Sequence, residues 1–266
     1  MTATYQIYAV RYGRHERTAR HNFLGGDEHD GPMPLDFYVW AIVGEKRTII
    51  LDTGFDETVA QRRGRNIVRP VGDGLKAIGI SPESVEDVIV SHMHYDHAGN
   101  HDLFPRARYH VQDAELAYCT GRCMCYPHVR ATFDADDVSA MVKRVFSGRV
   151  VFHDGEEELA PGITLHKVGG HTQGLQIVRV ATERGWVVLG SDAAHFYANL
   201  EQGRPFPIVD NLPAYFEAQR TMLRLASSPH HVIPGHDPLV LERYRDAKAG
   251  LAGVVRLDLP PKSGNT

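Results

Sequence analysis

Four side chains that commonly bind metal ions lie within the short segment 92–97: His92, His94, Asp96 and His97. An apolar run at 88–90 precedes them and predicts a buried strand. Alternate side chains of an extended segment point the same way, so the first three can converge at the strand's exit, and the fourth begins the next turn. Neutral imidazole and carboxylate suit Zn²⁺ and its first-row neighbours. The segment therefore predicts a metal site, with a histidine-rich surface loop as the alternative.

A metal needs ligands from more than one loop, and three further candidates follow other predicted strands. Each lies within two residues of a glycine, which lets the backbone turn sharply and bring the side chain inward. Taken singly, each can equally be a capping or surface residue. Their shared position at strand exits favours a common site for His171, Asp192 and His236.

Five histidines and two aspartates exceed the four ligands of one tetrahedral zinc. Two metals with one carboxylate between them can use all seven. The residual positive charge of such a centre suits an oxyanion that forms during attack on a carbonyl. Asp52, in the strand-end sequence Asp52-Thr53-Gly54, either caps the turn or holds a metal-bound histidine from behind.

Composition sets limits on the partners. The chain has 266 residues and a net charge of −4, without a block of Lys and Arg, so we expect no nucleic-acid partner. Its apolar runs are too short to span a bilayer. The N-terminus has no secretory signal pattern, which favours a cytoplasmic location. A small molecule is the expected partner, and the chain can be a monomer or a homodimer.

The chain has three cysteines, all in one cluster: Cys119, Cys123 and Cys125. An odd, clustered set argues against a disulfide framework. Reduced thiols packed near a pocket are favoured over a second metal site, because paired metal-ligand spacing is missing.

Strands dominate the predicted elements. They are expected over residues 4–12, 35–43, 47–51, 88–90, 109–111, 150–152, 162–165, 175–180, 186–189 and 231–233. Helices are expected over 70–78, 100–104, 113–118 with Asp113 as N-cap, 136–145 and 214–226. Segments 13–34 and 119–134 are expected to be irregular. The fold class is α/β (α+β): two sheets packed face to face with helices outside, in one domain over 1–266 with a loose tail at 258–266.

Five motifs follow one another along the chain: Leu51-Asp52-Thr53-Gly54, the segment 91–97, Gly170-His171, Ser191-Asp192 and Gly235-His236. In these motifs and their order, the chain resembles the metallo-β-lactamase superfamily. The resemblance implies an αββα sandwich of two mixed sheets, with the metals at the edge between them. By resemblance, one metal is held by His92, His94 and His171, and the second by Asp96, His97 and His236, while Asp192 bridges. Two divalent ions are implied, Zn²⁺ first, with Fe, Mn or Co as alternatives.

Within the superfamily, the chain is most similar to the N-acyl homoserine lactonase branch. The similarity lies in its length, the spacing of its ligands and the absence of extra domains. That likeness implies attack of a metal-bridging hydroxide on the lactone carbonyl, with Asp96 returning a proton to the leaving oxygen. Lactonases of this branch carry a tyrosine three residues after the bridging aspartate, where this chain has His195. We expect His195 or Tyr197 to stabilise the oxyanion.

Two other classes of function are open. One is a hydrolase with the same metal chemistry that acts on another ester, either a thioester as in glyoxalase II or a phosphoester. The chain lacks a basic C-terminal cluster for glutathione, and a β-lactamase usually lacks the bridging aspartate. A non-catalytic metal-stabilised domain or a di-iron redox protein is the other class. The redox form normally carries a flavin domain, for which the length leaves no room.

Two irregular segments, 25–35 and 118–127, are expected to wall the substrate pocket. The second supplies three side chains that can contact an acyl chain: Tyr118, Met124 and Tyr126. Ordinary loop packing explains the same residues equally well.

Overall fold

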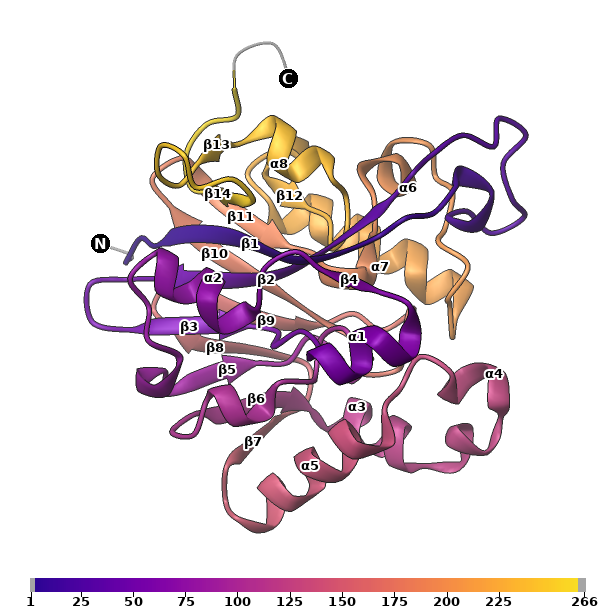
Figure 1. Cartoon of the computed structure of the whole chain (residues 1–266), viewed down its shortest axis with the longest axis horizontal. Coiled ribbons are helices and arrows are strands. Elements are labelled where there is room, and N and C mark those ends of the chain that lie inside the picture. The colour runs from indigo at the N-terminus through magenta and orange to yellow at the C-terminus, as the bar shows by residue number, and fades with distance from the viewer. Residues whose placement is uncertain (1–2, 263–266) are drawn as a thin grey trace.

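The computed structural model describes residues 3–262, which form two β-sheets packed against each other (Figure 1). The strands of the larger sheet run in the order β13 (Arg245–Asp246), β14 (Val254–Arg256), β1 (Gln6–His15), β2 (Leu35–Val43), β3 (Thr48–Leu51), β5 (Asp87–Ile89), β6 (Arg108–Gln112) and β7 (Val150–His153), with β4 (Asn66–Ile67) paired to β1. The smaller sheet runs β12 (Val232–Ile233), β11 (Gly185–Leu189), β10 (Gln176–Thr182), β9 (Ile163–Lys167) and β8 (Glu156–Ala160).

Both sheets are mixed. In the larger sheet β3, β5, β6 and β7 are parallel neighbours, whereas β1, β2 and β3 pair antiparallel. In the smaller sheet only β11 and β12 pair parallel. Parallel neighbours place their carboxyl ends at the same edge of a sheet, so the loops that follow them gather there.

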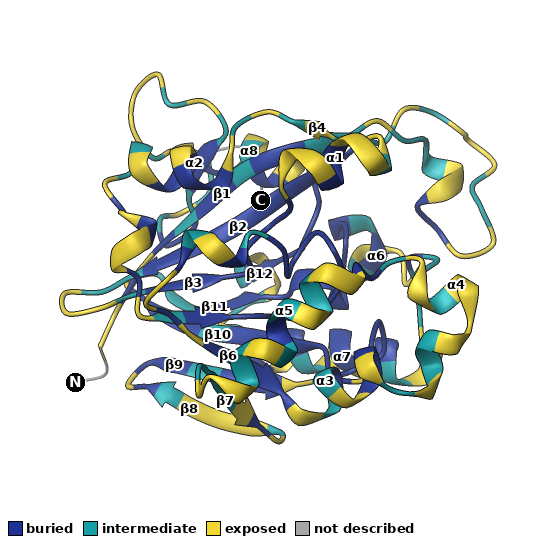
Figure 2. Ribbon diagram, turned by 60° about the horizontal axis from the view of Figure 1, so that its bottom comes forward, coloured by how far each residue is buried: buried dark blue, intermediate teal, exposed yellow. Residues whose placement is uncertain are grey.

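The main core lies between the sheets. Along β2, Trp40 and Ile42 face this core, while Val39 and Ala41 face the opposite side. Side chains alternate along a strand, so a strand covered on both faces has a continuous apolar sequence, as the stretch 37–42 does. Figure 2 shows most strands of the two sheets buried beneath helices with exposed outer surfaces, whereas the edge strand β8 is exposed over much of its length.

Helices cover the outer faces. Those whose apolar side chains join the outer core of the larger sheet are α1 (Glu57–Arg63), α2 (Val71–Ala77), α3 (Asp113–Thr120) and α5 (Ala135–Phe146). On the other side, α7 (Leu212–Leu225) packs Ala218 and Met222 against Ile177 and Val188 of the smaller sheet. Shorter helices are α4 (Pro127–Arg130), α6 (Tyr197–Glu201) and α8 (Leu239–Arg243). The αββα sandwich and the α/β class are confirmed.

Several local predictions need correction. Asp113 is not the N-cap of α3, because the cap is Gln112 and its side chain makes no capping hydrogen bond. The segment 119–134 contains α4 and the short 3₁₀ turn Arg122–Cys125. Residues 258–262 are held to the body, since Asp258 accepts the N–H of Ile7 and the N–H of Lys262 donates to Arg243. The remainder of the predicted loose tail, 263–266, lies outside the described residues.

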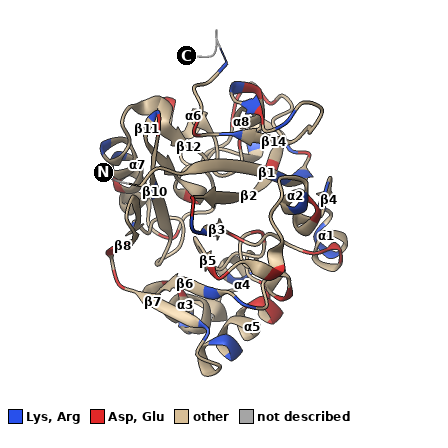
Figure 3. Cartoon of the chain, turned by 90° about the vertical axis from the view of Figure 1, so that its left-hand side faces the viewer, with Lys and Arg blue, Asp and Glu red and all other residues tan. Residues whose placement is uncertain are grey.

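Charges of both signs are interspersed over the outer helices and loops in the view of Figure 3. Within residues 3–262, none of the helices combines the length and the apolar character needed to cross a bilayer.

Candidate metal centre

All seven predicted ligands lie at one edge of the sandwich, in loops that follow strands. The segment with His92, His94, Asp96 and His97 leaves β5, and His171 lies in the loop between β9 and β10. Asp192 lies in the 3₁₀ turn Ser191–Ala193 after β11, and His236 follows β12. Both sheets therefore supply side chains to the same place.

The backbone turns that bring these side chains inward are tight. Gly169 and Gly170 have φ of 64° and 89°, and a Cβ on Gly170 would lie 2.5 Å from the backbone nitrogen of Tyr215. A side chain at Gly170 would clash, so the turn before His171 requires glycine there. Two non-glycine residues beside the site, Asp52 (φ 64°) and Ser191 (φ 43°), also adopt the left-handed conformation. Such conformations are disfavoured for residues with a Cβ and gather at functional sites.

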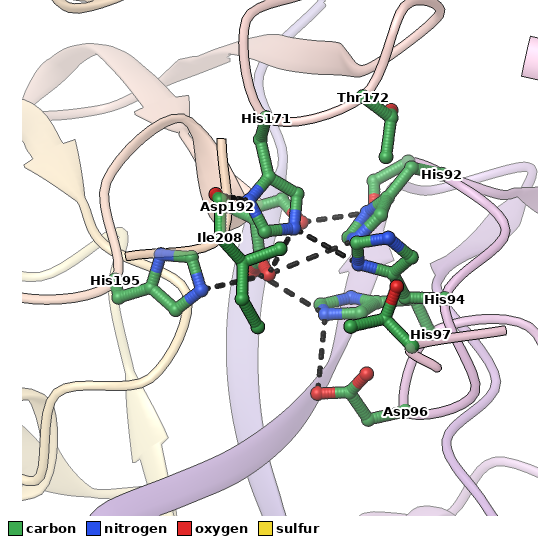
Figure 4. Close-up of polar contacts among 12 residues, drawn as sticks. His92, His94, Asp96, His97, His171, Thr172, Asp192, His195 and Ile208 are labelled. Carbon is green, nitrogen blue, oxygen red and sulfur yellow. Dashed lines mark hydrogen bonds and ion pairs between the residues drawn. The ribbon is translucent and has the colours of Figure 1, made fainter. Parts of the chain in front are cut away.

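The two carboxylate oxygens of Asp192 face different histidines. Figure 4 shows this carboxylate among the labelled imidazoles of the cluster. Its Oδ2 lies 3.1 Å from His171 Nε2 and 3.7 Å from His92 Nε2. Its Oδ1 lies 2.9 Å from His236 Nε2 and 3.3 Å from His97 Nε2. One carboxylate thus stands between two groups of imidazoles, as a bridging ligand does.

Each group is compact. The ligand atoms of His92, His94, His171 and Asp192 lie within 4.8 Å of one another, and those of Asp96, His97 and His236 do likewise. These are the two sets that the family resemblance implies. The structure brings all seven side chains together.

Most rings are held from behind through Nδ1. The Nδ1 of His97 lies 2.7 Å from Asp52 Oδ2, that of His171 lies 2.8 Å from the Ile208 carbonyl oxygen, and that of His236 lies 3.0 Å from the Asp36 carbonyl oxygen. An Nδ1–H donated in this way leaves Nε2 as the free lone pair directed at the site. Asp52 also accepts the backbone N–H of Ser91. It therefore holds the start of the histidine loop as well as one ring.

Unpaired buried atoms show that the cluster fits cations. His92 Nε2, His97 Nε2 and Asp192 Oδ1 are buried without a hydrogen-bond partner among the described residues. Such atoms are rare in native proteins unless an ion or water satisfies them. Burial lowers the pKa of His92 and of His94 well below the usual value. Both rings are therefore neutral near pH 7, as metal ligation requires.

In the second group of ligands, the pKa of His97 is shifted in the opposite direction. Burial by itself would lower the pKa of His97, but the carboxylates of Asp192, Asp96 and Asp52 together raise it well above its usual value. Three carboxylates around one ring create a negative site that attracts a proton or, in its place, a metal cation. The residues present fit two divalent cations.

The structure separates the two candidates for oxyanion stabilisation. His195 lines the cavity at the cluster, with Nε2 3.1 Å from Asp192 Oδ2 and its ring stacked on Phe206 at 3.5 Å between centroids. Tyr197 instead packs in the core between the sheets, with its ring 3.8 Å from the guanidinium carbon of Arg243. Tyr197 does not line the cavity, so that part of the prediction is wrong.

A cavity of ≈ 120 Å³ opens beside the cluster. Tyr118, Met124 and Tyr126 are not among its lining residues, contrary to the expectation from sequence. Tyr118 packs edge-on against Phe133, and Tyr126 lies on the exposed surface. The walls come from other segments: His15, Arg17, Leu35, Phe37, Arg63, Arg65, Tyr95, Ala131, Thr132, Phe206 and Ile208.

Glu115 is a structural residue of the site that the sequence analysis missed. Its buried carboxylate accepts the backbone N–H of Met93 at 2.8 Å, the hydroxyl of Thr172 at 2.7 Å and the N–H of Gly174 at 3.0 Å. It therefore joins the His92–His97 loop to the loop that carries His171. Burial raises the pKa of Glu115, while these three donors oppose the rise. No local sequence pattern marks this role, because the three donors belong to loops that are distant from Glu115 in the chain.

The three cysteines are unpaired, and Cys119 is buried while Cys125 is exposed. Burial raises the pKa of the Cys119 thiol well above its usual value, which leaves it protonated and unreactive near pH 7.

Known proteins resemble this chain at low identity. An N-acyl homoserine lactonase of Bacillus sp. is 27% identical over 231 residues, covering 80% of this chain and 86% of that protein, and one of Bacillus cereus is 25% identical over 220 residues, covering 77% and 82%. A solved N-acyl homoserine lactone hydrolase with N-hexanoyl-L-homoserine at its catalytic metal centre superimposes with a TM-score of 0.73 at 21% identity, covering 91% of this chain and 96% of the other. The dizinc quorum-quenching lactonase AidC gives 0.71 at 14%, covering 96% and 90%.

These solved structures share the fold of the present chain, and the sequence relatives extend the likeness over most of its length. The model of the metallo-beta-lactamase superfamily matches residues 35–241, which contain all seven clustered ligands. The chain belongs to the metallo-β-lactamase superfamily.

Proposed function

We propose that this chain is a dinuclear metal hydrolase that opens the ester bond of a lactone ring, that of an N-acyl homoserine lactone or a similar lactone. The observation that carries the proposal is Asp192, whose two oxygens each face a different group of histidines. The sequence relatives named as N-acyl homoserine lactonases support the choice of a lactone.

In this proposal His92, His94 and His171 hold one cation, Asp96, His97 and His236 hold the other, and Asp192 is shared. Imidazole and carboxylate ligands favour Zn²⁺, with Fe, Mn and Co as alternatives. When bound, such a pair of cations supplies Lewis acidity and lowers the pKa of a water at the site.

Asp96 has the position needed to move a proton. It lines the cavity, and its Oδ2 lies 3.6 Å from His97 Nε2 and 3.7 Å from His236 Nε2. A carboxylate that uses one oxygen toward this group keeps a second oxygen for a proton. We assign to Asp96 the transfer of a proton from the attacking water to the alkoxide that leaves when the ring opens.

His195 has the position needed to steady the carbonyl oxygen. Burial lowers the pKa of its imidazole to about 3, so the ring is neutral near pH 7 and has one N–H to donate. Stacking on Phe206 fixes the plane of the ring. A fixed donor aimed at developing negative charge costs no reorganisation during the reaction.

The test is to measure metal content and turnover on the same samples, with a lactone, a thioester and a phosphodiester as substrates. We expect about two metal ions per chain and hydrolysis of the lactone above the other two. Asp192→Asn and His94→Ala should lose metal and turnover together. His29→Ala removes an imidazole that is 95% exposed, and should keep both.

Preferential cleavage of the thioester or the phosphodiester would replace the lactone with another ester of the same chemistry. An Asp192→Asn variant that retained full turnover without metal would overturn the dinuclear centre.

A further inference from the structure

Three arginines line the cavity beside the histidine cluster. Arg17 comes from the connection between β1 and β2, and Arg63 and Arg65 come from the end of α1 and the segment after it. All three are half-buried. Lactone rings and acyl chains are neutral, so a lactonase pocket for such substrates has no need of these charges.

The hydrogen bonds of these arginines go to neutral oxygens. Arg63 donates to the carbonyl oxygens of Ala131 and Phe133, both at 2.8 Å. Arg65 donates Nε–H to the hydroxyl of Tyr95 at 2.9 Å and Nη1–H to the Arg63 carbonyl at 2.6 Å. Over residues 3–262, none of the three arginines forms an ion pair. Their positive charges are therefore not neutralised by the protein.

Two half-buried arginines of β1, in contrast, are neutralised. Arg11 and Arg14 of β1 share the buried carboxylate of Asp36, at 3.2 Å and 3.3 Å. The two carboxylates that line the cavity, Asp96 and Asp192, belong to the candidate metal centre. The contrast indicates that the counter-ion of the cavity arginines comes from outside the chain.

Neighbouring groups respond to this uncompensated charge. Burial lowers the pKa of Arg17, and the charge of Arg65 lowers it further. Burial followed by Arg65 and Arg17 lowers the pKa of His15 to about 4. His15 is therefore neutral near pH 7, and the guanidiniums carry the positive potential of this wall.

Donors remain free for a ligand. Among the described residues, Arg65 Nη2 and Arg17 Nη1 have no hydrogen-bond partner. In Arg63, by contrast, both Nη1 and Nη2 donate hydrogen bonds, and the guanidinium packs on the Tyr95 ring at 4.0 Å. Guanidinium N–H groups bind a planar carboxylate strongly and with defined geometry.

The cavity is also small. Its volume of ≈ 120 Å³ is well below the roughly 300–1,000 Å³ of pockets for drug-sized ligands. Leu35, Phe37, Phe206 and Ile208 form its apolar part. A long acyl chain would have to extend outside this space.

We infer that the substrate of this site is a compact lactone that carries a carboxylate, with the carboxylate bound by Arg17 and Arg65 and the ring carbonyl at the histidine cluster. The inference rests on the proposed lactone hydrolysis and specifies its substrate class. It distinguishes the site from one that takes a neutral lactone with a long acyl chain.

The first experiment compares two γ-butyrolactones that differ only in charge: one bears a carboxylate on the carbon next to the ring oxygen, and the other a carboxamide there. On metal-loaded protein we expect kcat/KM to be roughly 10- to 100-fold higher for the carboxylate. The ratio should fall as salt is added, because screening weakens the attraction. N-hexanoyl homoserine lactone serves as the neutral long-chain comparison.

Equal or better turnover of the carboxamide or of the hexanoyl lactone would overturn this inference and leave lactone hydrolysis intact. If no lactone in the set is opened, both the inference and the proposed function fail.

The second experiment uses variants and a binding measurement. Arg17→Gln and Arg65→Gln should each lower the carboxylate-to-carboxamide ratio about tenfold, mainly through KM, and Arg17→Lys should restore part of it. Arg220→Gln removes a 78% exposed arginine on α7 and should leave the ratio unchanged. Titration with the γ-lactam carboxylate, which has no ester to cleave, should show the same order in Kd. Unchanged ratios and Kd values in both glutamine variants, with unchanged Tm, would overturn the assignment.

Discussion

At the scale of single residues, Asp192 organises the site because its two oxygens divide the imidazoles into two groups. The buried Ser191 beside it adopts φ 43°, and Gly235 packs against the same turn, where a Cβ would lie 2.7 Å from the Ser191 carbonyl oxygen. The chain thus accepts a disfavoured backbone conformation to aim one carboxylate.

His195 is the residue whose role needs testing first. We expect His195→Ala to lower kcat about 100-fold, because an oxyanion donor is lost, while both metal ions stay bound. His195→Gln, which retains an N–H, should recover part of the rate. The measurement is kcat together with metal content. Loss of one metal ion in His195→Ala would instead make His195 a ligand, since its Nε2 lies 3.1 Å from Asp192.

Asp52 acts through His97, whose Nδ1 it contacts at 2.7 Å. Removing such an outer partner typically costs 10- to 100-fold in metal affinity, so we expect that loss for one metal in Asp52→Asn, measured by competition with a chelator. Asp154→Asn removes an exposed aspartate that pairs with Lys167 and should leave the affinity unchanged. Equal affinities in the two variants would show that Asp52 serves only the turn.

Sequence predicts the parts of the site whose residues are close together in the chain. His92, His94, Asp96 and His97 are close in the chain, so spacing alone brings them together. Glu115 and the cavity arginines meet the site only through packing between distant loops, which no local pattern encodes. The role predicted for Tyr197 in oxyanion stabilisation was wrong for the same reason, because the first turn of α6 directs its side chain into the core.

At the scale of elements, periodicity predicted most of the buried strands, whereas the short buried strand β14 and the edge strand β8 were missed. The sequence of β8 begins Glu-Glu-Glu, and its first three residues are exposed. Charged edge strands lack the apolar alternation on which strand prediction depends, although they protect a sheet from pairing with other chains. Helix α1 was missed because only Val59 and Ala60 are buried in it.

The first turn of α5 carries a stability cost that depends on pH. Asp137 has a buried Oδ2 without a hydrogen-bond partner among residues 3–262. Burial, then the charges of Asp134 and Asp56, raise its pKa from 3.8 to about 7. Between these two values the folded protein binds more protons than the unfolded chain, so stability falls as pH rises through this window.

We therefore expect Asp137→Asn to be more stable than the parent at pH 8 by roughly 2 kcal/mol, with the gain vanishing near pH 4. Denaturant unfolding at both pH values measures it. Asp136→Asn changes an exposed aspartate of the same turn and should show a much smaller pH dependence. A constant difference between Asp137→Asn and the parent across this range would contradict the assigned cause.

At the scale of the whole molecule, the cluster joins the two sheets. The larger sheet supplies the loop of His92 to His97, and the smaller sheet supplies His171, Asp192 and His236. Cations bound by ligands from both sides stabilise the sandwich, because the unfolded chain offers no such preformed site. Stability and metal binding are therefore linked through the whole fold.

Addition of Zn²⁺ to chelator-treated protein should raise Tm, with the rise complete near two equivalents. At free metal about 1,000-fold above Kd, the stabilisation per site is about 4 kcal/mol. Asp192→Asn should show a much smaller rise, because the carboxylate that both groups share becomes a neutral amide with one oxygen, while His29→Ala should behave like the parent. A rise complete at one equivalent would mean that only one group of ligands binds. An unchanged Tm would mean that the seven side chains meet without forming a metal centre.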